Sequence, residues 1–177
     1  MKTTGIFKAL EEHNFPDDVR SQFERVKESK GNWLKKKAGY IGIMDNLLTE
    51  EQRLLLWERG GMCTGGETGV QCKKLARELR GRPLAEKVEL ANQNGHIYRH
   101  HLNEDGTITA YCFCHCLQDR YNKTKPVKLP SEYGCAAGAA FHNLQIALGV
   151  KGRITSIDYP RDGDGKKFMT FTFEVVE

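Results

Sequence analysis

Residues 107–116 read TITAYCFCHC and join a strand pattern to three alternating cysteines. Side chains alternate between the two faces of a β-strand, so Cys112, Cys114 and Cys116 are predicted to lie on one face. Tyr111 and His115 then lie on the other face. This stretch predicts a sheet of which one face ends in a row of thiols.

The segments on either side of this stretch complete a small antiparallel sheet. His96–Leu102 is predicted to form a hairpin with Thr107–Phe113, because the loop between them carries the Asp-Gly pair that tight turns favour. Further along, Val150–Tyr159 and Phe168–Val176 are predicted as the last two strands. Apolar and polar residues alternate in the final strand, which indicates one buried face and one solvated face.

A helix rich in small residues, predicted over Cys135–Leu148, lies in sequence between the two pairs of strands. Upstream of residue 96 the patterns are helical. Thr49 and Gln52 form a capping box before an apolar run, which marks a helix start, and Gly60 ends that helix. The other helices are expected to start near Ile6, Asp17, Trp33, Val70 and Leu84.

These patterns predict an α+β fold, in which a helical N-terminal half packs on a small antiparallel β-sheet with a crossing helix. Residues 1–95 would form the helical region and residues 96–177 the cysteine-containing, ligand-binding α+β region, the two together making one compact unit. A chain of 177 residues is long enough to bury a core of that size.

Composition argues against membrane and nucleic-acid binding. No run of about 18 apolar residues occurs, and the N-terminus has no apolar secretion signal, so a cytoplasmic protein is expected. The net charge is only +4, and the one short basic run, Lys35–Lys37, is predicted to lie on a solvated helix face. We therefore expect no nucleic-acid partner and no membrane partner.

Cysteine usage carries the functional inference. All cysteines fall between positions 63 and 135, and in a reducing cytosol clustered cysteines more often bind metal or do redox chemistry than form structural disulfides. The competing interpretation is a set of buried cysteines that behave as small apolar residues. The candidate metal ligands, for zinc or an iron-sulfur cluster, are Cys63, Cys72, Cys112, Cys114, Cys116 and Cys135.

Two further residue types are candidates for chemistry. Cys135 is expected at the opening of its helix, where the helix N-terminus lowers the pKa of a thiol and favours the thiolate. His100 and His101 would alternate faces on the first strand, so at most one of them can point to a site. A surface position is expected for the pair.

The segment from Cys135 to Val176 resembles a known family. A cysteine-glycine opening, a small-residue helix, the strand Arg153–Asp158, a glycine-aspartate turn and a closing Phe-x-Phe strand look like the end of the 4-vinyl reductase type of small-molecule-binding domain. They are also similar to its cysteine-rich relatives, among them proteins related to L-2-amino-thiazoline-4-carboxylic acid hydrolase. The resemblance covers roughly the last seventy residues. It implies an apolar pocket enclosed by helix and sheet, with cysteines near its mouth.

Two functional hypotheses follow. The first is a cytosolic cysteine-rich protein that binds zinc or an iron-sulfur cluster through thiolates and has a pocket for a small organic ligand. The alternative is a metal- or thiolate-dependent hydrolase or reductase that acts on a small molecule. A homodimer is also expected, because the C-terminal hairpin leaves a sheet edge that needs cover.

Overall fold

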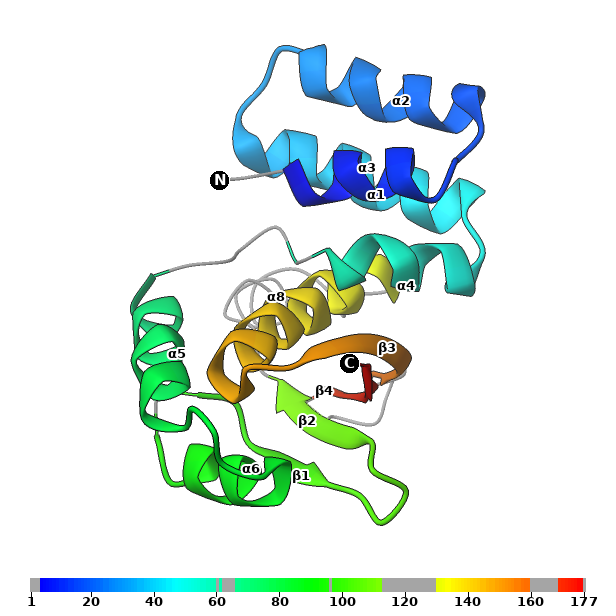
Figure 1. The fold of residues 1–177 in the computed structure, drawn as a ribbon. Helices are drawn as coiled ribbons and strands as arrows, with labels where there is room; N and C mark the ends of the chain where they lie inside the picture. The colour runs from blue at the N-terminus through cyan, green and yellow to red at the C-terminus, as the bar shows by residue number, and fades with distance from the viewer. Residues whose placement is uncertain are drawn as a thin grey trace.

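The protein has the predicted α+β class (Figure 1). The computed structural model describes residues 4–59, 61, 66–95, 97–112, 130–159 and 169–176. Within these residues the chain forms a helical N-terminal half, a four-stranded antiparallel sheet and one long helix against that sheet. The helices are α1 (Thr4–Glu12), α2 (Asp17–Glu28), α3 (Trp33–Leu47), α4 (Glu50–Glu58), α5 (Gly66–Glu78), α6 (Leu84–Asn92) and α8 (Pro130–Leu148).

Local sequence explains where several helices begin. Thr49 caps α4 as predicted, because its side chain accepts the backbone N–H of Gln52 while the Gln52 side chain accepts the N–H of Thr49. The Asn32 side chain caps α3 by accepting the Lys35 N–H. The prediction that α3 is one helix in spite of its two glycines is confirmed.

The sheet has the strand order β1-β2-β4-β3, with β1 at His100–Leu102, β2 at Ile108–Cys112, β3 at Lys151–Asp158 and β4 at Met169–Val176. The last strand therefore lies inside the sheet, and β3 is the edge of the C-terminal hairpin. Ile108 pairs with Phe173 and Cys112 with Met169, so apolar residues of neighbouring strands share one face. The β1–β2 turn is closed as expected, with Gly106 at a φ of 83°.

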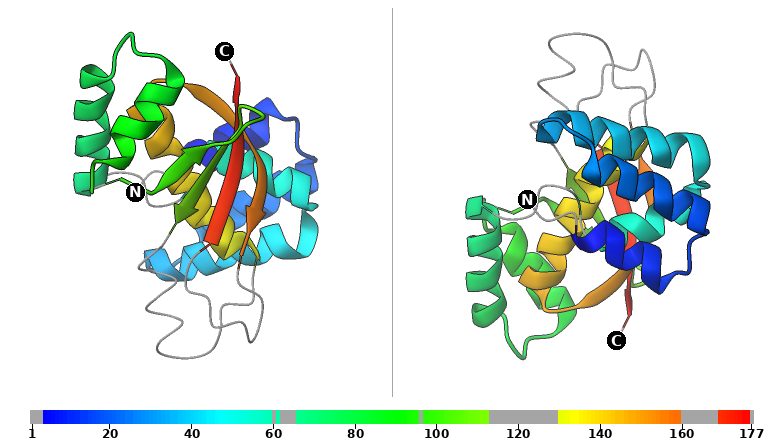
Figure 2. Two further views of the ribbon diagram at one scale, coloured as in Figure 1. Left: turned by 90° about the horizontal axis from the view of Figure 1, so that it is seen from below. Right: turned by 90° about the horizontal axis from the view of Figure 1, so that it is seen from above.

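Helix α8 is the centre of the molecule. It lies across the apolar face of the sheet, and α3, α4, α5 and α6 pack around it (Figures 1 and 2). All residues from Ser131 to Phe141 are buried, which is possible because most of them are small. Phe141 anchors the helix to the sheet through edge contacts with Phe171 and Phe173, at centroid distances of 6.5 and 5.2 Å. No described helix covers the opposite face of the sheet (Figure 2, left).

Some predicted boundaries were wrong. Helix α8 begins at Pro130 rather than Cys135, because a proline fits the first helical position and a side chain from α3 caps the next residue. Helix α5 begins at Gly66 rather than Val70. Strand β1 begins at His100, four residues later than the predicted start at His96, which itself lies outside the described residues. The predicted strand ends at Phe113 and Phe168 also lie outside them.

Candidate functional site

Three of the six candidate ligands lie in the described part of the chain. Cys72 is on α5, Cys112 ends β2, and Cys135 is on α8. All three are buried thiols. Cys63, Cys114 and Cys116 lie outside the described residues.

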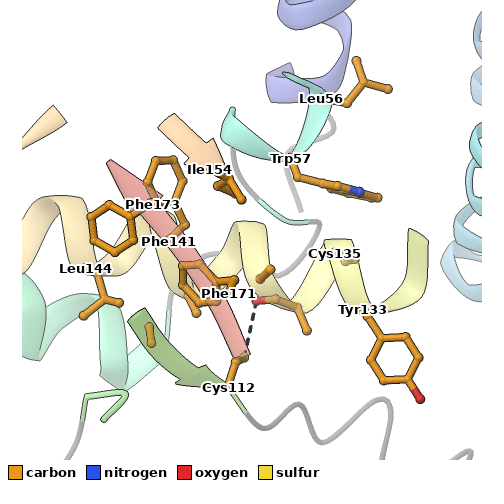
Figure 3. Close-up of a cluster of buried hydrophobic side chains, with 14 of the residues drawn as sticks. Leu56, Trp57, Cys112, Tyr133, Cys135, Phe141, Leu144, Ile154, Phe171 and Phe173 are labelled. Carbon is orange, nitrogen blue, oxygen red and sulfur yellow. Dashed lines mark hydrogen bonds between the residues drawn. The ribbon is translucent and has the colours of Figure 1, made fainter. Parts of the chain in front are cut away.

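Cys112 lies against the turn of α8 that carries Cys135. Its Sγ donates a hydrogen bond to the carbonyl oxygen of Ala136 at 3.5 Å, as the dashed line in Figure 3 shows. The register of β2 turns the Cys112 side chain to the face that α8 covers. Residues far apart in the sequence, one at a strand end and one in a helix, are thus brought to the same part of the core.

Cys135 does not occupy the position that the sequence predicted for it. Because α8 starts at Pro130, Cys135 lies in the second turn, where the helix N-terminus has little effect on a thiol pKa. It is also only 3% exposed. The expectation that Cys135 opens its helix is therefore wrong.

Gly61 brings the segment after α4 into direct contact with α8. A Cβ added at Gly61 would lie 2.1 Å from the carbonyl oxygen of Cys135 and 2.8 Å from the Cβ of Ala139. Only a glycine allows this approach. The chain therefore passes beside Cys135 two residues before it reaches Cys63, whose own position lies outside the described residues.

Cys72 lies in different surroundings. It is fully buried on α5, and burial alone raises the pKa of its thiol to about 11. Among the described residues, no three His, Cys, Asp or Glu side chains form a group that could hold a metal ion. Cys72, Cys112 and Cys135 therefore do not make a three-ligand site by themselves.

A polar cluster that the sequence did not reveal surrounds the start of α8. Asp45 on α3 accepts hydrogen bonds through Oδ1 from the N–H and the hydroxyl of Ser131, at 3.1 and 2.7 Å. Its other oxygen, Oδ2, is buried and has no hydrogen-bond partner. Glu132, the next residue of α8, is also buried, 6% exposed. Lys37, further along α3, is buried as well, 7% exposed. The prediction that Lys37 lies on a solvated helix face is therefore wrong.

Aromatic rings enclose the same part of α8. The Trp57 indole packs directly on Gly134, where an added Cβ would lie 2.1 Å from Nε1 (Figure 3). Tyr133 stacks on Tyr159, which follows β3, with a centroid distance of 5.0 Å and nearly parallel planes. The first turns of α8 thus carry or contact the Cys135 thiol, aromatic rings and the carboxylates of Asp45 and Glu132.

A second buried polar group lies at the other end of the sheet. His100 is 3% exposed, its Nδ1 lies 2.7 Å from the carbonyl oxygen of Tyr98, and its Nε2 has no hydrogen-bond partner. Burial lowers the pKa of this imidazole. The expected surface position is wrong for His100, whereas His101 on the opposite face is exposed and contacts the ring of Tyr111.

Comparisons with family models, with curated proteins and with solved structures gave no match. Within the described part of the chain, no helix combines the length and the apolar character that crossing a membrane requires.

Proposed function

We propose that this chain is a cytosolic, cysteine-rich protein that binds zinc or an iron-sulfur cluster through thiolates and accepts a small organic ligand beside it. One observation carries the proposal: Cys112 at the end of β2 hydrogen-bonds the backbone of α8 next to Cys135. The alternating cysteines begin at Cys112, so this contact joins the start of that row to the helix. Thiolate ligands from separate elements are typical of both metal centres.

The cysteines differ in how well they suit this role. Cys112 contacts Ala136, the residue after Cys135 on α8, and further thiolates would have to come from Cys63, Cys114 or Cys116. Cys72 differs from them in position, because it lies on α5 rather than at the contact between β2 and α8. We therefore place Cys112 and Cys135 in the site and treat Cys72 as a buried core thiol.

The ligand pocket is proposed for the start of α8. Tyr133, Tyr159 and Trp57 supply apolar area there, and the buried Oδ2 of Asp45 supplies an acceptor without a partner. Small-molecule sites combine an apolar lining with a few fixed polar groups. The resemblance to 4-vinyl reductase-type domains agrees with a ligand held between helix and sheet.

The alternative of a thiolate-dependent hydrolase or reductase has less support. A nucleophilic cysteine needs exposure and a lowered pKa, whereas Cys135 is buried and lies in the second turn of α8. A metal-dependent enzyme would use the same ligands and would keep one coordination position open.

The test is elemental analysis together with an optical spectrum of protein purified without air. We expect bound zinc, or iron with the absorption of an iron-sulfur cluster. Cys112→Ser and Cys135→Ser should lose that metal, while Cys72→Ser should retain it and serves as the matched control for replacing a buried thiol. Wild-type protein without zinc, iron or cluster absorption would refute the proposal.

A further inference from the structure

At both edges of the sheet, side chains from neighbouring helices bind backbone groups with which an added strand would pair. Strands β1 and β3 are the edges, and an edge strand normally presents N–H and C=O groups that another chain can pair with. Here some of the outward groups on each edge, those of His100 on β1 and the N–H groups of Gly152 and Ile154 on β3, already have hydrogen-bond partners supplied by three helices.

On β1 the partner is Asn92, the last residue of α6. The carbonyl of Arg99 accepts the N–H of Tyr111 on β2, so in the alternating antiparallel ladder the backbone groups of His100 point away from β2. The Asn92 side chain binds both of them: its Oδ1 accepts the His100 N–H at 3.0 Å and its Nδ2 donates to the His100 carbonyl. One carboxamide thus makes the pair of bonds that a neighbouring strand would make.

On β3 two side chains each accept one outward N–H group. Gly152 donates its N–H to Oε1 of Gln145 on α8, and Ile154 donates to Oε1 of Glu58 on α4, both at 3.0 Å. These N–H groups are two residues apart, which is the spacing of outward groups along an edge. Beyond Ile154 the pairing with β4 shifts register, and such an irregularity further disfavours an added strand.

We propose that Asn92, Gln145 and Glu58 act as edge caps that prevent a second copy of this chain from adding a strand to either edge. The partner that they exclude is a β-strand of an identical molecule, because such a strand would have to pair with the same outward N–H and C=O groups that the caps occupy. The expected homodimer stays a prediction, and the inference limits the surface it can use to one other than the capped edge positions.

The experiment compares Asn92→Ala and Gln145→Leu with Gln93→Ala, an exposed neighbour of Asn92 at the end of α6. Hydrogen exchange reports the amides of His100, Gly152 and Ile154, and sedimentation over a range of concentrations reports mass. We expect wild type and Gln93→Ala to show the same mass profile. Each cap variant should exchange the uncapped amide faster, by roughly 2- to 10-fold as the loss of one hydrogen bond implies, and should gain mass with concentration.

A variant that retains half of the clamp keeps the test valid if Asn92→Ala fails to fold. Asn92→Asp retains an acceptor for the His100 N–H but loses the donor to the His100 carbonyl. It should therefore self-associate more than wild type and less than Asn92→Ala. If Asn92→Ala does not fold, the comparison of Asn92→Asp with wild type remains. The proposal is overturned if the cap variants expose their amides and yet keep the wild-type mass. It is equally overturned if wild type dimerises and these three amides become better protected as it does so.

Discussion

At the scale of single residues, two helical glycines allow a matched test of how tightly α8 is enclosed. A Cβ at Gly134 would lie 2.1 Å from Nε1 of Trp57, whereas a Cβ at Gly42 in α3 would meet nothing within 4 Å. We expect Gly134→Ala to lower the free energy of unfolding by about 1–3 kcal/mol through overpacking. Gly42→Ala should raise it by up to about 1 kcal/mol, because alanine favours the helix. Denaturant unfolding measures both, and equal stability of the two variants would contradict the contact.

His100 should make stability fall on the acid side. Because burial lowers its pKa in the folded protein, the unfolded chain takes up the proton first as pH falls below about 6.5. Stability is therefore complete above that pH and is lost between about 6.5 and the lower folded-state pKa, by up to about 1.4 kcal/mol per pH unit. The measurement is the free energy of unfolding as a function of pH.

The control for this prediction is the next residue. His100→Gln should reduce the slope of stability against pH, whereas His101→Gln, on the exposed face, should keep the wild-type slope. If both variants retain the slope, the acid sensitivity belongs to other groups.

At the scale of elements, the start of α8 depends on a residue 86 positions earlier in the chain. The carboxylate of Asp45 caps this helix by accepting the N–H and the hydroxyl of Ser131. Replacing a capping side chain typically costs about 0.5–2 kcal/mol. We expect Asp45→Ala to lower the free energy of unfolding by this amount. Asn46→Ala, an exposed neighbour on α3, should change it by less than about 0.5 kcal/mol, and a similar loss in both would mean that the cap contributes nothing.

The same long-range contacts mark the limit of what sequence could predict. Elements with local signals were predicted correctly, such as α4 with its capping box and the hairpin turn at Gly106. The start of α8 was missed because its cap comes from α3, and because Pro126 and Pro130 in the sequence indicate a loop. The burial of Lys37 and His100 was missed for a related reason, since no local pattern distinguishes a buried charged or polar residue from a solvated one.

At the scale of the whole molecule, α8 connects the two predicted regions. It contacts α3, α4 and α5 on one side and the sheet on the other (Figure 1). Residues 1–95 also reach the sheet directly, through α4 against β3 and α6 against β1. Alternation correctly predicted that Cys112 shares the buried face of β2 with Ile108 and Ala110, whereas Cys114 and Cys116 lie outside the described residues. The approach of Cys112 to α8 was expected from chemistry rather than from any sequence signal, and the contact with Ala136 agrees with it.

A metal held between β2 and α8 should stabilise the whole body. A metal that binds only the folded state adds its binding free energy to stability, on the order of 10 kcal/mol for structural zinc, whereas a typical domain has about 5–15 kcal/mol in total. Under the proposed function, a strong chelator should therefore lower the melting temperature of metal-loaded wild type, because β2 and α8 lose the link between Cys112 and Cys135. The double variant Cys112→Ser with Cys135→Ser lacks those ligands. Its melting temperature should therefore be the same with and without chelator. Wild-type protein that has demonstrably lost its metal and still melts at the original temperature would show that the metal does not hold the fold together.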